Sequence, residues 1–180
     1  MARYRSRRLA LSLPLPDGAA WRIDDHTHPE LMATHAPTRS RIVVAVFWAD
    51  SLVGRRECEA IARERNIIPV GVLQVLEDEA TLTQGTFDTR IEVGLVSGET
   101  PDRPIVGHVM AFGGFLRKCY AFDFSTEVAS AREEDGLSSR LAFARTRILG
   151  GLVLGSIDAL ARDPGPSGRA PERSPSSPAR

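Results

Sequence analysis

The chain has 180 residues, and its 23 basic and 23 acidic side chains give a formal net charge of zero. This length suits one domain with a sizeable hydrophobic core, and the hydrophobic share of 42% and charged share of 26% are those of a globular protein. The composition excludes a collagen-like or wholly disordered chain. A neutral chain also gives no reason to expect non-specific nucleic-acid binding.

The charge is unevenly distributed along the chain. Residues 1–16 carry +4, residues 163–180 carry +1, and the segment between them therefore carries −5; Lys118 is the only lysine. We expect a basic N-terminal arm at 1–8, a single domain at 9–162 and a disordered tail at 163–180. In the tail, 11 of 18 residues are Pro, Gly or Ser, so it has too little apolar surface to offset the entropy cost of ordering.

No segment predicts a signal peptide or a membrane span. The apolar run at 9–16 is short and holds two prolines, and the longest uncharged apolar run, 148–157, has ten residues, whereas a membrane-spanning helix needs about 20. We therefore expect a cytoplasmic protein without membrane insertion. In a reducing compartment Cys58 and Cys119 would be buried thiols, and in an exported protein they could form one disulfide.

The first half of the chain predicts several strands and one helix. Apolar patterns predict strands at 9–13, 21–24, 31–35 and 41–48. Asp50 or Ser51 is expected to cap a helix that runs to about Arg65 and carries Cys58 on its apolar face. Asn66 is expected to end this helix.

The second half predicts antiparallel strands and a closing helix. Strands are expected at 70–76, 86–96, 105–112 and 115–128, with loops at 77–85, 98–104 and 130–136. Gly113-Gly114 is expected to form a two-residue hairpin turn, because such turns need positive φ at both positions. A second helix is expected to begin near Leu137, with apolar residues continuing to Leu160.

Grouped strands with two helices indicate an α+β fold, namely an antiparallel sheet with two main helices packed on it. Over residues 9–160 this element order resembles the Mog1/PsbP-like group, and the resemblance implies a non-enzymatic binding, adaptor or chaperone-like role with an unknown protein partner. Tyr120, Phe122 and Phe124 are candidate aromatics for such an interface, although aromatic residues on a long strand more often belong to the core.

One alternative is a metal site. His26 and His28 stand two residues apart in an extended segment beside Asp25, so both rings could face one zinc ion. The His-x-His pattern resembles the first motif of amidohydrolase and PHP-type metallohydrolases, but these are (β/α) barrels, and here long antiparallel strands are expected. We favour a polar loop in which Asp24 and Asp25 accept backbone hydrogen bonds.

A second alternative is a cysteine-dependent enzyme. With a turn at Gly113-Gly114, His108 would lie directly opposite Cys119 on the same face of the hairpin. An imidazolium beside a thiol lowers the thiol pKa and can activate it as a nucleophile. No oxyanion hole or orienting third group is apparent in the sequence, so we favour core roles for both residues.

The sequence therefore predicts a non-enzymatic binding domain without a cofactor. It assigns no catalytic residue and no metal ligand, with Cys119 and His108, or His26, His28 and Asp25 with zinc, as the alternatives.

Overall fold

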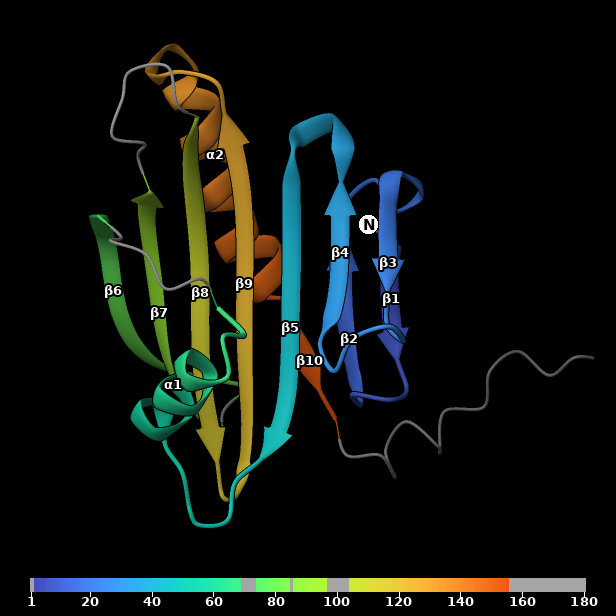
Figure 1. The fold of residues 1–180 in the computed structure, drawn as a ribbon, viewed down its shortest axis with the longest axis vertical. Coiled ribbons are helices and arrows are strands. Elements are labelled where there is room, and N and C mark those ends of the chain that lie inside the picture. Colours follow the sequence, from blue (N-terminus) through green and yellow to red (C-terminus); the bar gives the residue numbers. More distant parts are fainter. Residues whose placement is uncertain (1, 69–73, 85, 97–103, 156–180) are drawn as a thin grey trace, which may run out of the picture.

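The computed structural model describes residues 2–68, 74–84, 86–96 and 104–155. Within them, seven strands form an antiparallel sheet in the order β3-β4-β5-β9-β8-β7-β6, and β1, β2 and β10 form a second, smaller sheet (Figure 1). The large sheet consists of β3 (Trp21–Asp24), β4 (Leu31–His35), β5 (Ser40–Trp48), β6 (Gln74–Thr83), β7 (Phe87–Val96), β8 (Ile105–Phe115) and β9 (Lys118–Val128). The small sheet consists of β1 (Ala2–Ser6), β2 (Leu11–Leu15) and β10 (Val153–Leu154).

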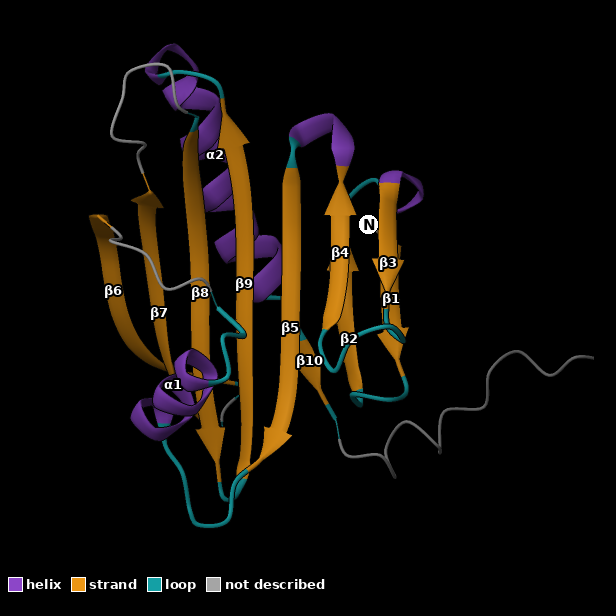
Figure 2. Cartoon of the chain, viewed as in Figure 1, coloured by secondary structure: helices purple, strands orange, loops and turns teal. Residues whose placement is uncertain are grey.

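The two main helices lie on opposite faces of the large sheet (Figure 2). Helix α1 (Arg55–Glu64) covers one face, and α2 (Glu134–Phe143) covers the other and continues as a π-helical segment, Ala144–Leu149. Short 3-10 turns occupy Gly18–Ala20, Ala36–Thr38 and Ala131–Glu133. The α+β class expected from the sequence is thereby confirmed. No helix among the described residues has the length and apolar character needed to span a bilayer.

The strands of the large sheet bury both faces, and each face has its own core. Along β9, Tyr120, Phe122 and Phe124 point into the larger core, which lies between the large sheet, the small sheet and α2. Ala121 points to the other side, into the smaller core under α1. This alternation follows from the two-residue period of side chains along a strand.

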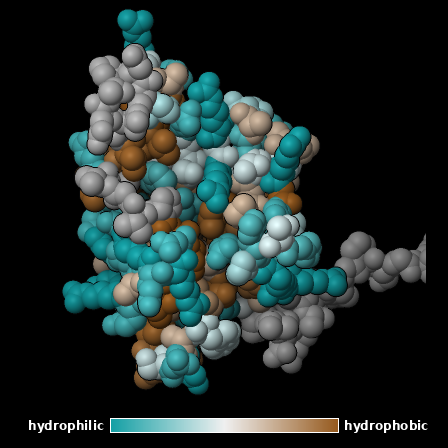
Figure 3. All heavy atoms as spheres, in the orientation of Figure 1, coloured by the Kyte–Doolittle hydropathy of each residue, from teal (hydrophilic) through white to brown (hydrophobic). Residues whose placement is uncertain are grey.

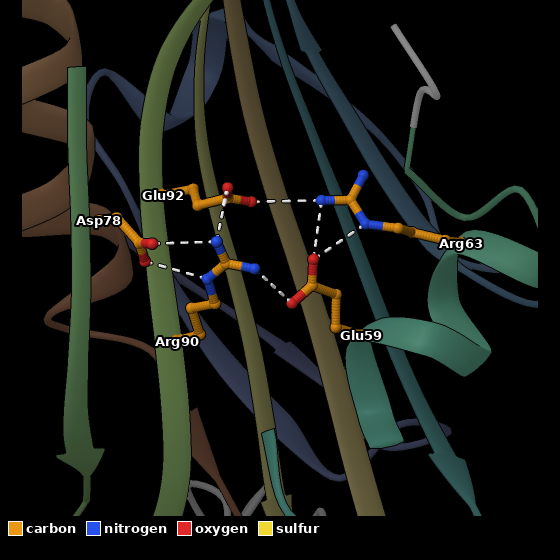
Figure 4. A network of polar contacts seen from close by, with 5 residues as sticks. All are labelled: Glu59, Arg63, Asp78, Arg90 and Glu92. Atoms are coloured by element: carbon orange, nitrogen blue, oxygen red, sulfur yellow. Dashed lines mark hydrogen bonds and ion pairs between the residues drawn. The ribbon is translucent and has the colours of Figure 1, made fainter. Parts of the chain in front are cut away.

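Helix α1 is attached to the sheet by a covalent bond and by ion pairs. The sulfur atoms of Cys58 on α1 and Cys119 on β9 form a disulfide, which was one of the two states left open by the sequence. Arg63 and Glu59 of α1 join Arg90 and Glu92 of β7 in one network, whose outermost member is Asp78 of β6 (Figure 4). The network raises the pKa of Arg90 and lowers that of Asp78, chiefly through their hydrogen bonds to each other.

The start of α1 differs from the sequence-based prediction. The helix begins at Arg55, with Gly54 as its N-cap residue, and not after Asp50 or Ser51. The side chain of Glu57 accepts a hydrogen bond of 2.9 Å from the Gly54 N–H, which satisfies a donor left open at the helix start. Asn66, which follows the helix, has a φ of 54°, a conformation that Asn tolerates better than most residues.

The acidic stretch at 77–85 was predicted as a loop, but residues up to Thr83 belong to β6. Asp78 reaches Arg90 on the α1 side, whereas Glu77 and Glu79 reach Arg145 on the opposite side. β6 is the outer strand of the sheet, and acidic side chains are common on such edges because they discourage pairing with other chains. The polar composition therefore reflects an edge strand.

The predicted turn at Gly113-Gly114 is also wrong. Both glycines lie inside β8, and the chain reverses at Leu116-Arg117, where Leu116 has a φ of 54°. A Cβ atom at position 113 would lie 2.0 Å from Cε1 of Tyr120, and one at position 114 would lie 2.8 Å from the Gly54 backbone. The glycines therefore allow close packing instead of a turn.

The N-terminal arm takes part in the fold. Residues Ala2–Ser6, expected to belong to a basic N-terminal arm outside the domain, form β1 and pair with β2. The guanidinium of Arg3 donates to the Gly151 carbonyl oxygen at 2.7 Å. The expected loop at 98–104 and the tail at 163–180 fall almost wholly outside the described residues.

Candidate functional site

A cavity of about 580 Å³ lies at one end of the large sheet, and we call it the end pocket. This volume lies within the range of small-molecule sites, roughly 300–1,000 Å³. The residues around it are Arg8, Leu9, Ala10, Val46, Trp48, Thr86, Phe87, Phe115, Leu116, Lys118, Leu154 and Gly155. Most of them are apolar, none is acidic, and they include the cations Arg8 and Lys118.

Strand ends place the aromatic and cationic side chains of the end pocket. Trp48 is the last residue of β5, Phe115 is the last residue of β8, and Lys118 is the first residue of β9. In the antiparallel register Lys118 lies opposite both Trp48 and Phe115. The turn at Leu116-Arg117 and the Leu9-Ala10 turn between β1 and β2 complete this end.

Several large apolar side chains near the pocket remain open to solvent. Trp48 is 68% exposed, Leu116 60% and Phe115 41%. Apolar side chains also reach the surface at the lower end of the face that carries α1, whereas the outer side of α1 is hydrophilic (Figure 3). Adjoining apolar side chains left open to solvent are typical of binding sites.

The two cations of the end pocket have different partners. Arg8 donates to the buried carboxylate of Asp25 at 3.0 Å and to the Pro29 carbonyl oxygen at 2.6 Å, so its charge is compensated. The Lys118 ammonium donates to the Gly155 carbonyl oxygen at 2.8 Å and has no acidic partner among the described residues. Burial lowers the pKa of Lys118, because desolvation disfavours the charged form.

A second, smaller cavity of about 290 Å³ lies on the α2 side of the large sheet. His35, nearly buried, borders it, and its Nδ1 lies 2.7 Å from the hydroxyl of Thr38. In the described part of the chain its Nε2 has no hydrogen-bond partner, and the nearest carboxylate oxygen, on Asp17, is 3.9 Å away. Because the Nε2 atom is itself buried, a ligand could not reach it without a rearrangement.

The residues of the His-x-His motif do not converge on one point. His26 and His28 are exposed, whereas Asp25 is buried and accepts hydrogen bonds from Tyr4 and Arg8. Within 2–68, 74–84, 86–96 and 104–155, no group of three or more His, Cys, Asp or Glu side chains could hold a metal ion.

The loop around the two histidines is organised by Asp24. Its Oδ1 accepts backbone hydrogen bonds from His26 at 3.1 Å and Thr27 at 2.9 Å. These bonds, first that from Thr27, lower the pKa of Asp24 to about 2, because they stabilise the charged carboxylate. Asp24 therefore accepts backbone hydrogen bonds as expected. The carboxylate of Asp25 instead accepts hydrogen bonds from the side chains of Tyr4 and Arg8. Arg8 also donates to the backbone carbonyl oxygen of Asp25.

His108 and Cys119 are not brought together as the hairpin prediction required. With the turn at Leu116-Arg117, His108 lies opposite Ser125, and Cys119 lies opposite Gly114. Cys119 is bonded to Cys58, and a disulfide sulfur has no thiolate to act as nucleophile. His108 instead pairs with Asp123, a residue not singled out from the sequence, at 2.9 Å between Nδ1 and Oδ1.

The three candidate interface aromatics of β9 belong to the core. Tyr120 and Phe122 are almost completely inaccessible, and Phe124 is also buried. The hydroxyl of Tyr120 bonds with those of Thr83 at 3.0 Å and Thr89 at 3.1 Å, while burial raises its pKa. The exposed aromatics are instead Trp48 and Phe115, which lie on two other strands, and Phe143 at the end of α2.

The signal that could have identified the end pocket is weak in the sequence. Trp48 closes an apolar strand and Lys118 is the only lysine, but 70 residues separate them in the chain. Only the strand order β5-β9-β8 brings them side by side. Correct placement of the β8–β9 turn would have put Phe115 opposite Lys118.

The sequence matches no known protein family, and no curated protein is significantly similar to it. Solved structures are similar in fold. Cyanobacterial PsbP (CyanoP) from Synechocystis sp. PCC 6803 is 13% identical, with a TM-score of 0.55, over 86% of this chain and 92% of CyanoP. A protein from Bacteroides thetaiotaomicron is 9% identical, with a TM-score of 0.51, over 86% of this chain.

This chain spans 48% of the length of the Bacteroides protein. LpqN, described as involved in cell envelope biogenesis of Mycobacterium tuberculosis, is 16% identical with a TM-score of 0.47, over 79% of this chain and 82% of LpqN. The overlap with CyanoP covers most of both chains. The chain therefore has the PsbP-like α+β fold.

Proposed function

We propose that this protein is a non-enzymatic binding domain of the adaptor type, which holds an apolar group of its partner in the end pocket. The observation that carries the proposal is the conjunction of a 580 Å³ cavity with the exposed side chains of Trp48, Phe115 and Leu116 at its border. Moving such apolar surface out of water is favourable by about 25 cal/mol per Å².

The chemistry around the pocket supports binding. Among the described residues that line it, Lys118 is the only titratable group besides the paired Arg8, and none is an acid that could act as a general acid or base. The expectation of a protein partner stays a prediction, since the mainly apolar lining does not identify a protein as the source of the bound group.

The disulfide bears on where this binding takes place. Disulfides persist in oxidising compartments and are rare in the cytosol, where thiols are kept reduced. The Cys58–Cys119 bond joins α1 to the sheet and so supports a location under oxidising conditions, in preference to the cytoplasmic location expected from the sequence. Because both cysteines are buried, the test is to quench cells with acid and then alkylate free thiols in denaturant: unmodified cysteines support an oxidising location, and two modified cysteines contradict it.

A neutral apolar dye tests the proposed function. Nile red should fluoresce on binding to the full chain, and Trp48→Glu should weaken its binding about tenfold or more, because a carboxylate then lies at the border of the pocket. Leu76→Glu is the matched control, since Leu76 is 52% exposed on β6 and is not part of the pocket. Failure of the dye to bind, or equal binding by both variants, would refute the proposal.

A further inference from the structure

The end pocket contains a cation that nothing in the described protein neutralises. The Lys118 ammonium is half-buried, and its partner is a neutral carbonyl oxygen, that of Gly155. A carbonyl oxygen accepts a hydrogen bond from one of the three N–H donors of an ammonium, but it carries no net charge to compensate the positive charge. Burial of a charge is costly unless the charge is paired, so the site is electrostatically incomplete.

Other cations of the protein show what a complete arrangement looks like. Arg90 pairs with three acids and Arg55 with Asp88, and Arg8, in the end pocket itself, pairs with Asp25. Lys118 differs because the walls around it are mainly apolar and, in the described part of the chain, include no carboxylate. The lowered pKa of Lys118 has the same cause, namely desolvation without a compensating negative charge.

Apolar walls extend away from this cation in more than one direction. Trp48 and Phe115 flank Lys118 on the neighbouring strands, while Phe87 and Leu154 border the same cavity. A ligand complementary to this arrangement has a hydrocarbon body and one anionic end. A cationic head group would meet no acid among the described residues that line the pocket.

We propose that the end pocket binds a free long-chain carboxylate, with its carboxylate on the Lys118 ammonium and its hydrocarbon chain against the apolar walls. The inference rests on the proposed function and names the class of ligand. A charge-assisted hydrogen bond is worth about 1.5–3 kcal/mol, which corresponds to a preference of roughly tenfold or more for the carboxylate over an uncharged analogue.

The test compares dodecanoate with dodecanol, both below their aggregation limits, by calorimetric titration of the full chain. Dodecanoate should bind at least about tenfold more tightly. Lys118→Gln should abolish this preference while retaining dodecanol binding, and Lys118→Arg should restore it. Arg22→Gln removes an exposed cation of β3 outside the pocket and should leave both affinities unchanged.

The possible outcomes separate this inference from the proposed function. Equal affinities for the two compounds would overturn the carboxylate preference and leave the binding function standing, whereas no binding of either would refute both. A preference that survives Lys118→Gln would contradict the role of Lys118. Binding to phosphatidylglycerol vesicles that requires Lys118, without competition from dodecanoate, would assign the cation to a membrane surface and overturn the inference.

Discussion

Lys118 at the start of β9 lies directly opposite Trp48 at the end of β5. The only lysine of the chain is thereby placed beside its most exposed aromatic side chain, at the border of the end pocket. Neither residue belongs to a sequence motif, so only the pairing of β5 with β9 brings them together. The proposed binding function depends on this end of the sheet.

The disulfide between α1 and β9 should contribute strongly to stability. Its cysteines are 61 residues apart, and in the chain-entropy account a bridge over such a loop stabilises the fold by roughly 4 kcal/mol. Urea unfolding with and without dithiothreitol measures this contribution. The Cys58→Ser, Cys119→Ser double variant should unfold like the reduced protein and be insensitive to dithiothreitol. A midpoint unchanged by the reductant would show that the bond is absent or contributes nothing.

Gly113→Ala should destabilise the fold, because the new methyl group would overlap the ring of Tyr120 at 2.0 Å. Overpacking of this kind costs about 1–3 kcal/mol. Gly136→Ala on α2 is the control: its Cβ would enter open space, and alanine favours a helix over glycine by up to about 1 kcal/mol. Thermal unfolding should move in opposite directions for the two variants, and equal shifts would contradict the packing described for β8 and β9.

The buried pair of His108 and Asp123 should be energetically coupled. Asp123→Ala leaves the imidazole without its partner and should cost about 1–3 kcal/mol, the penalty for an unsatisfied buried polar group. In a double-mutant cycle with His108→Ala, the coupling energy should exceed about 0.5 kcal/mol. Strictly additive losses in urea unfolding would show that the two side chains do not interact.

The loop around His26 should respond to acid at unusually low pH. The backbone N–H groups of Thr27 and His26 lower the pKa of Asp24 to about 2. At pH values above the ordinary Asp pKa of about 3.9, the charged carboxylate therefore contributes its full stabilisation to the loop. That contribution falls as the pH drops through the range of about 4 to 2. Amide NMR signals of His26 and Thr27 should titrate with a midpoint near 2, and lose this transition in Asp24→Ala. A midpoint near 4 would contradict the hydrogen bonds.

The sequence predicted the fold class and most strands because their side-chain periodicity survives in the structure. The apolar stretch around 41–48 and the alternation at 86–96 correspond closely to β5 and β7. The strand expected at 70–76 overlaps β6 only at 74–76, and its residues 70–73 lie outside the described residues. The rest of β6 was missed because an edge strand tolerates acidic residues, so local composition resembled a loop. The β8–β9 turn was misplaced because Gly113 and Gly114 serve close packing against Tyr120 and Gly54, a contact between distant segments.

The candidate site was less predictable than the fold, for the same physical reason. His26, His28, Cys119 and His108 stand out by residue type, yet the structure separates the reactive pairs that their sequence spacing suggested. The end pocket instead depends on apolar residues from several strand ends and turns. Only tertiary pairing places them around Lys118.

The two indoles of the chain provide the most direct test of the central claim, that the end pocket takes up an apolar group. Trp48 borders the pocket, whereas Trp21 is nearly buried elsewhere and its Nε1–H donates to the Pro16 carbonyl oxygen at 2.7 Å. In two-dimensional ¹H–¹⁵N spectra, dodecanol should shift the Trp48 indole signal in a saturable manner and leave that of Trp21 in place. An unmoved Trp48 signal, or equal movement of both, would contradict the account.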